Sequence, residues 1–372
     1  MIHPASITHV LHVDTGREWQ SVRDQVRLLV QGLQDEPEIR QAVATVGPSR
    51  FAAECRELGI PVFPLPGEVG TDPGTIRELV RHVREGWDVI HAHDARAVAL
   101  MVYLQALVGS QAVLVASRRS SAPPGPTGRW HRADIVLAVS GPARDALIHA
   151  GIERRRVHIV PNCVVAEEFS DGSAGILHGA VGAEPEHRLI ASFTGLNAHR
   201  DHKTFIQAAA LLRDRIPDAR FVILGRGPER RALEEMIEEY DLGGRVCLPG
   251  HLPDARQFLG EIDVFVMPAL QQEVTSACIE AMAAGVPVIM PGVSSGETAA
   301  DAAVAVATET IPPRNPEALA AAVERLLGDS AHYDALGRRG REFALRHGPP
   351  ALVRSTLAAY RAVLRRQRLC IP

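Results

Sequence analysis

The stretch QQEVTSACIEAMAAGVPVI, residues 271–289, decides the fold. It follows a strand-like run and predicts a loop, a helix, a tight turn and a strand, in that order. Thr275 or Ser276 is expected to cap the helix, and Gly285 with Pro287 two places on marks its end. Such alternation of strand and helix is typical of an α/β protein with a parallel sheet.

Two carboxylates, Glu273 and Glu280, bracket this helix start. The unpaired N–H groups of a first helical turn and the helix dipole favour an anion there. A carboxylate at this place can hold ligand hydroxyls while the segment Val274, Thr275 and Ser276 holds a phosphate, so the pairing suits a nucleotide-sugar. The alternative is two acidic residues at a helix start that favours them anyway.

The acidic loop followed by IEAMAAGVPVI resembles the donor-site signature of retaining glycosyltransferase family 4, whose members have the GT-B fold of two facing Rossmann-like domains. In that family two glutamates flank seven residues; the first lies beside the transferred sugar and the second binds the ribose. Glu280 matches the second glutamate, and Gln272 stands at the family spacing for the first. Glu273, one residue closer, is the candidate catalytic carboxylate, with Gln272 as a donor contact.

Length and composition agree with this class. The 372 residues suffice for two domains, and the contents of 46% hydrophobic and 23% charged residues are ordinary for a globular protein. A net charge of −4 argues against a nucleic-acid partner held by bulk positive charge. Five scattered cysteines give no disulfide framework and indicate a cytoplasmic protein. The uncharged run 97–117 is interrupted by Gln105 and a turn, so it predicts a buried helix and strand instead of a membrane span.

The predicted domains are an acceptor-side domain, residues 1–166, joined by a returning C-terminal helix within 350–372, and a donor domain, residues 167–349. The segment 164–187 is expected to be an irregular polar linker. The arginines of the final helix leave peripheral contact with an anionic membrane face open, with a plain solvated face as the alternative.

In the first domain, the strand Ile7 to Val13 leads into a loop with Thr15 and Gly16. The family resemblance implies paired glycines in this loop, which let the backbone approach donor and acceptor. Thr15 replaces the first of them and Gly16 matches the second. An ordinary turn between strand and helix is the alternative.

His91, His93 and Asp94 lie at the carboxyl end of another predicted buried strand. Ligand-binding residues of a Rossmann-like sheet lie at such strand ends. The two histidines point to the same side and could bind a metal, but the sequence shows no clear third ligand, so no metal is expected. By resemblance this pattern lines the acceptor side, with His93 in the catalytic centre. Histidines satisfied by backbone groups are the alternative.

Arg118 and Arg119 follow the next strand. Relatives frequently place a histidine near Ser117 to contact the transferred sugar, and this chain has none there. The two arginines can instead hold an anionic acceptor or a phosphate, or they remain solvated.

In the second domain, Arg200 and Lys203 lie at a helix start beside a strand end, a place suited to a diphosphate. Asp201 is expected to cap that helix. The resemblance puts Arg200 at the family's lysine, a catalytic position, and Gly195 where an arginine is usual.

The turn beginning Gly225-Arg226 matches the family's GxGPE motif, although GxG alone is a weak signal. The resemblance also implies that the nucleotide base is bound by Gly250, His251 and Leu252.

The sequence therefore predicts a retaining, metal-independent glycosyltransferase that uses a nucleotide-diphosphate sugar, needs no cofactor and acts on an unidentified hydroxyl acceptor. The alternative is a GT-B protein that has lost catalysis and serves as partner of an active enzyme, because several motif positions depart from the family. A sugar-nucleotide epimerase of the same architecture is a third reading. Sugar, base and oligomeric state are not predicted.

Overall fold

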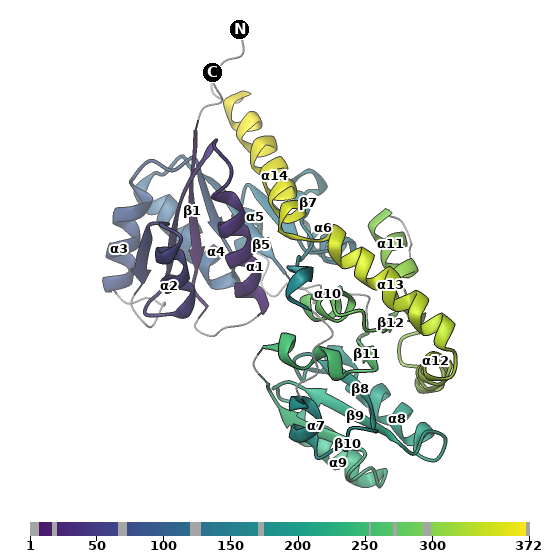
Figure 1. Cartoon of the computed structure of the whole chain (residues 1–372). Helices are drawn as coiled ribbons and strands as arrows, with labels where there is room; N and C mark the ends of the chain where they lie inside the picture. Colours follow the sequence, from purple (N-terminus) through teal and green to yellow (C-terminus); the bar gives the residue numbers. More distant parts are fainter. Residues whose placement is uncertain are drawn as a thin grey trace. The chain divides into compact units, whose positions relative to one another are not determined.

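The computed structural model describes residues 7–16, 21–65, 73–119, 128–169, 175–252, 254–270, 274–292 and 299–369. The chain forms two compact units. Unit 1 comprises Met1–Cys163 and Pro349–Pro372, and unit 2 comprises Val164–Gly348. Each unit has a parallel sheet with helices packed around it (Figure 1), which confirms the predicted class of two Rossmann-like α/β domains.

Unit 1 contains a seven-stranded sheet in the order β3-β2-β1-β4-β5-β6-β7, with parallel pairing throughout. Its strands are β1 (Thr8–Asp14), β2 (Ile39–Val46), β3 (Val62–Leu65), β4 (Val89–Ala92), β5 (Val113–Arg118), β6 (Ile135–Ala138) and β7 (Val157–Ile159). Its helices are α1 (Ser21–Leu33), α2 (Arg50–Glu57), α3 (Pro73–Val83), α4 (Ala95–Val108), α5 (Gly128–Arg132), α6 (Gly141–His149), the 3-10 turn η1 (Arg154–Arg156) and α14 (Pro349–Leu369). Helix α4 and strand β5 confirm the buried helix and strand predicted for the run 97–117.

Helix α14 returns to unit 1, where it packs beside α1 (Figure 1). Two of its arginines bind unit 1 directly: Arg361 pairs with Glu38, and Arg366 donates to the carbonyl of Arg155 over 2.9 Å. None of the helices that the structure describes combines the length and the apolar character that crossing a membrane requires.

Unit 2 contains a six-stranded parallel sheet in the order β10-β9-β8-β11-β12-β13. Its strands are β8 (Arg188–Phe193), β9 (Ala219–Leu224), β10 (Val246–Gly250), β11 (Val264–Val266), β12 (Val288–Pro291) and β13 (Glu309–Ile311). Its helices are α7 (Ile176–Val181), α8 (His202–Leu212), α9 (Arg230–Glu239), α10 (Ser276–Ala283), α11 (Ala299–Ala307), α12 (Pro316–Gly328) and α13 (Ser330–Arg346), with the 3-10 turns η2 (Ala166–Glu168), η3 (Ala198–Arg200), η4 (Ala255–Gln257) and η5 (Leu259–Glu261).

The order of strands reverses once in each sheet. The chain runs from β1 outward to β3 and then returns to place β4 beside β1; in the same way β11 returns beside β8. Ligands of open parallel sheets bind at the carboxyl ends of the strands at such a switch point. The loops that follow β1, β4, β8 and β11 are therefore the positions where a site is expected in each unit.

Two local predictions were wrong. The segment 164–187 is not an irregular linker, because it includes η2 and α7, and the buried carboxylate of Glu261 accepts hydrogen bonds of 2.8–2.9 Å from the backbone N–H groups of Ile176, Leu177 and His178. Asp201 does not cap α8 through a backbone N–H: it has a φ of 43°, and its carboxylate accepts instead from the Thr204 hydroxyl over 2.8 Å.

The glycines of the GxG turn are required by a crossing of two loops. A methyl carbon on Gly227 would lie 2.3 Å from the carbonyl oxygen of Leu196, and one on Gly225 would lie 2.1 Å from that of Thr194. The same loops are tied by hydrogen bonds from Leu196 N–H to the Arg226 carbonyl over 3.0 Å and from Glu229 N–H to the Leu196 carbonyl over 3.1 Å. Gly225 and Gly227 are therefore required for the close packing of the loops after β8 and β9.

We expect Gly227→Ala to lower the free energy of unfolding by about 3 kcal/mol or more. The added methyl group would clash with the backbone of Leu196, which cannot move aside as the end of a flexible side chain could. Urea unfolding of the variant measures this loss. Gly243→Ala is the matched control, since nothing lies within 4 Å of a methyl carbon placed there. If the two variants are equally stable, the loop crossing is not the reason why residue 227 is glycine.

Candidate functional site

In unit 1, Asp94 joins the loops that follow β1 and β4. Its carboxylate accepts from the backbone N–H of Thr15 over 2.7 Å and from the Thr15 hydroxyl over 2.8 Å. It also caps α4 by accepting from the N–H groups of Arg96 and Ala97, each over 2.9 Å. Asp94, predicted as an acceptor contact, therefore holds the loop, and the Thr15 side chain is turned inward with 2% of its surface exposed.

Asp14, at the end of β1, forms a buried ion pair with Arg23 of α1. Arg23 Nε and Nη2 each lie 3.1 Å from Asp14 Oδ2, and the Thr45 hydroxyl donates to the same oxygen over 3.3 Å. Gly16 N–H adds a longer bond of 3.4 Å to Asp14 Oδ1. Burial raises the pKa of Asp14, while the charge of Arg23 lowers it. Sequence reasoning missed this pair, which fixes α1 against the edge where Gly16 lies.

Three buried histidines line one face of the sheet behind these loops. Strand pairing sets His12 of β1 directly beside His91 of β4. His12 Nδ1 lies 2.9 Å from His93 Nε2, and the ring nitrogens of His91 lie 2.7 Å from the hydroxyl oxygens of Tyr360 on α14 and Ser117 on β5. The sequence offered no third partner for His91 and His93; the structure supplies His12, with ring nitrogens of all three residues within 4.8 Å of one another.

Burial keeps these rings neutral. It lowers the pKa of His12 to about 3 against a smaller opposing effect of Gln41, and it lowers the pKa values of His91 and His93 well below the ordinary value. The neighbouring histidines and Arg119 lower the pKa of His93 further. His93 Nδ1 is buried and has no hydrogen-bond partner among the residues that the structure describes. His93 is thus a neutral polar group in the loop after β4.

We expect the free energy of unfolding to be highest above pH 6.5 and to fall as the pH drops below it. The folded-state pKa values are depressed, so between pH 6.5 and those values the unfolded chain binds more protons than the folded chain. Each histidine adds a slope of up to about 1.4 kcal/mol per pH unit. Urea unfolding at pH 7.5, 6.5 and 5.5 measures it.

The variant His12→Gln separates this effect from other titrating groups. It is expected to flatten the fall between pH 6.5 and 5.5, whereas the same change at His9, whose side chain is 51% exposed, leaves the fall unchanged. A profile of His12→Gln parallel to that of the wild type would contradict the assignment.

Arg118 and Arg119 occupy different surroundings at the end of β5. The guanidinium carbon of Arg118 lies 5.6 Å from the centre of the Trp130 ring. Arg119 turns inward, donates from Nη1 to Asn162 Oδ1 over 3.1 Å, and has a buried Nε without an acceptor among the described residues. Burial lowers the pKa of Arg119 to about 10, so it stays charged at neutral pH. The Asn162 turn is itself fixed by two 2.8 Å bonds between the Gln25 amide and the backbone of Cys163.

In unit 2, the loops that follow β8 and β11 meet at the switch point. The Leu270 N–H donates to the His199 carbonyl over 3.2 Å, which joins the two loops. Arg200 Nη1 lies 3.8 Å from Met267 Sδ at the end of β11. The structure therefore turns the predicted phosphate-binding arginine toward the start of the loop that leads to α10.

Helix α10 begins as predicted. Thr275 is the N-cap, and its hydroxyl accepts from Cys278 N–H over 3.3 Å. Ser276 is buried at the first helical position, and Val274 and Glu280 are half-buried. Gln272 and Glu273 lie outside the described residues. The Thr275 hydroxyl is thus engaged in capping, so a ligand at this helix start would meet backbone N–H groups.

The predicted base-binding segment follows β10. Gly250 has a φ of +92°, and its carbonyl accepts from Gly225 N–H over 2.8 Å. His251 is exposed, and the half-buried Leu252 packs on the core. Arg226 is exposed and bonds to Leu196 through its backbone carbonyl. These residues lie at the carboxyl edge of the same sheet as Arg200.

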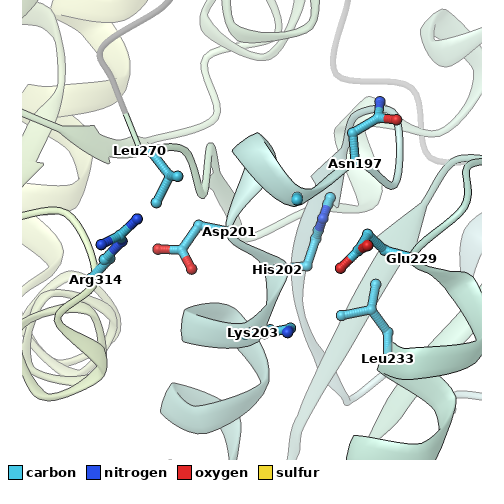
Figure 2. A pocket seen from close by; sticks show the side chains of 9 residues that line it. Asn197, Asp201, His202, Lys203, Glu229, Leu233, Leu270 and Arg314 are labelled. Atoms are coloured by element: carbon cyan, nitrogen blue, oxygen red, sulfur yellow. The ribbon is translucent and has the colours of Figure 1, made fainter.

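Lys203 lines a cavity of about 200 Å³ at the start of α8. Figure 2 shows Lys203 in it with Asp201 and Arg314, which face each other, and with Glu229. Asn197, Ala198, His202, Leu233 and Leu270 complete the lining, and Arg200, Glu280 and His251 are not part of it. The structure therefore brings Lys203 together with acidic residues and does not group it with the other predicted donor contacts.

The chain resembles known proteins in both units. The family models described as Glycosyltransferase Family 4 and as Glycosyl transferases group 1 match residues 11–168 and 176–343. The 2-deoxystreptamine glucosyltransferase of Streptomyces kanamyceticus is 30% identical over 249 residues, 64% of this chain and 64% of that protein, so the match spans less than two thirds of that relative. The alpha-D-kanosaminyltransferase of the same organism is 26% identical over 75% of this chain and 81% of its own length.

The solved structure of Anabaena HepE in complex with UDP and glucose is similar with a TM-score of 0.77 and 17% identity, and the similarity covers 94% of this chain and 98% of that one. This likeness supports the fold. With one family model on each unit and the same architecture over nearly its whole length, the chain belongs to glycosyltransferase family 4 and has the GT-B fold.

Proposed function

We propose that the protein transfers a sugar from a nucleotide-diphosphate sugar to a hydroxyl group of an acceptor. The observation that carries the proposal is the switch point of the unit 2 sheet, where Arg200, the start of α10 and Glu280 occupy adjoining loops and helix. A guanidinium and free helical N–H groups suit a diphosphate, and a carboxylate on the same helix suits ribose hydroxyls. The names of the family relatives support the same activity.

In the proposed reaction the anomeric configuration is retained and no metal ion is needed. Arg200 and the N–H groups of Ser276 and Ala277, which have no acceptor within the helix, neutralise the charge that develops on the leaving diphosphate. The leaving phosphate oxygen accepts the proton of the incoming hydroxyl on the same face of the sugar. Catalysis then depends on positioning and electrostatic stabilisation, without a covalent intermediate on the protein.

Two of the departures from the family pattern are accounted for within unit 1 and do not favour a protein without catalysis. Thr15, in place of the first loop glycine, turns its side chain onto Asp94 and away from the loop surface. Ser117, where relatives carry a nearby histidine, bonds to His91 over 2.7 Å. Both side chains thus have hydrogen-bond partners within unit 1, and the bonds from Thr15 to Asp94 hold the loop after β1 in place.

Calorimetric titration with UDP, GDP and ADP sugars, followed by an assay of donor hydrolysis, tests the proposal. Binding of one nucleotide class and slow release of free sugar are expected. UDP is the first nucleotide to test because HepE was solved with it, and 2-deoxystreptamine is included as a comparison acceptor because the name of one relative contains it. A protein that binds none of these nucleotide-sugars is not a glycosyltransferase of this kind.

A further inference from the structure

The charge of Arg119 is not balanced by any acidic side chain that the structure describes. Among the residues that the structure describes, its hydrogen-bond partner is the neutral Asn162 at 3.1 Å, and its buried Nε has no acceptor there. Arg119 as a whole is half-buried, and its shielded Nε loses hydration that an ion pair or a hydrogen bond normally replaces. The Arg119 guanidinium can therefore donate to an additional acceptor that the described residues do not supply.

The nearby carboxylates are engaged elsewhere. Asp14 is paired with Arg23 at 3.1 Å, and Asp94 accepts from Thr15 and from the first turn of α4. The three buried histidines are neutral and cannot supply a negative charge. An acceptor that carried an ammonium group would therefore find no available carboxylate among the described residues of this edge, whereas an oxyanion would find Arg119.

Resting on the proposed function, we propose that Arg119 forms an oxyanion subsite at the carboxyl edge of the unit 1 sheet, which takes a phosphate or carboxylate group of the acceptor. Arginine suits this role because its fork of N–H groups matches two oxygens of such a group. Nη1 is held by Asn162, so Nε and the remaining donors are oriented before the ligand binds. The acceptor class is then an acidic sugar or a sugar phosphate.

Binding to the full chain, measured by calorimetry in the presence of saturating UDP, tests the subsite. The probes are inorganic phosphate and glucose 1-phosphate, with glucose as the neutral counterpart and 2-deoxystreptamine as the cationic one. Both phosphates are expected to bind while UDP is present, and glucose at least tenfold more weakly. Failure of both phosphates to bind, or tighter binding of 2-deoxystreptamine, overturns the proposal without any variant.

Arg119→Gln is expected to weaken phosphate binding by about 10- to 100-fold, the loss of one or two charged hydrogen bonds, and to leave UDP affinity unchanged. Arg56→Gln, which removes an exposed positive charge from the same unit, is the control and should change neither. A loss of UDP affinity in Arg119→Gln would assign the arginine to the donor diphosphate instead. Nucleotide-sugar binding by the wild type is measured separately, so failure of the proposed function would be seen independently.

Discussion

Replacing Glu280 by alanine is expected to weaken UDP binding by about 100-fold. Glu280 is the fifth residue of α10, half-buried on the helix that starts at the unit 2 switch point. In the proposed function its carboxylate accepts from both ribose hydroxyls. Two hydrogen bonds to a charged group, each contributing about 1.5 kcal/mol or more, account for a loss of this size. Calorimetric titration of UDP into wild type and variant measures it.

Two further variants test whether the carboxylate itself is responsible. Glu280→Gln keeps one acceptor oxygen and the size of the side chain, so an intermediate loss is expected. Glu239→Ala, at the exposed end of α9, removes the same charge from the same unit and should leave UDP affinity within about twofold. If Glu280→Ala binds UDP as tightly as Glu239→Ala does, the ribose assignment is wrong.

Most of the fold could be predicted from the sequence because its signals are local. The periodicity of the strands and helices, the Thr275 cap and the stop at Gly285 each depend on a few neighbouring residues, and the structure confirms them. Asp201 shows the limit of such signals. An aspartate before a helix is a common cap, but here the loop places it at a φ of 43°, where its carboxylate meets Thr204 and no helical N–H.

The candidate site was predicted only in part because its remaining contacts are long-range. Tyr360 reaches His91 across 269 positions, and Glu261 caps α7 across more than 80. His12 becomes a neighbour of His91 only through the pairing of β1 with β4. No spacing in the sequence specifies such pairs, and for His12 the sequence predicted only that it lies in the first strand.

The same reasoning changes how the GxG turn is understood. The match to the family motif predicts a donor contact at Gly225, and the structure adds that the two glycines lie where the loops after β8 and β9 cross. A glycine needed for close backbone approach looks the same in sequence whether the partner is a ligand or another loop. The loop that the crossing supports carries Arg200, so the turn contributes to the site by fixing that loop.

Arg200→Ala is the second large effect that we expect, a fall of about 100- to 1000-fold in kcat. The guanidinium is directed to the end of β11, beside the loop that leads to the α10 start. With glycine at 195, where the family has an arginine, Arg200 is the cation on which the leaving diphosphate depends in the proposed reaction. Removing one preorganised donor to a developing charge typically costs this much. Rates of donor hydrolysis at saturating nucleotide-sugar measure it.

Lys203 provides the matched comparison because it is three residues away and carries the same charge. Its side chain lines the cavity with Asp201 and Glu229, which Arg200 does not line, so Lys203→Ala is expected to lower kcat by less than about fivefold. Arg200→Lys introduces the residue type usual in the family. It should be faster than Arg200→Ala but slower than the wild type, because an ammonium group keeps the positive charge but lacks the paired N–H donors of a guanidinium. If Lys203→Ala is the more damaging change, the diphosphate is bound at the start of α8, in the cavity of Figure 2, and the proposed orientation of the donor must be reversed.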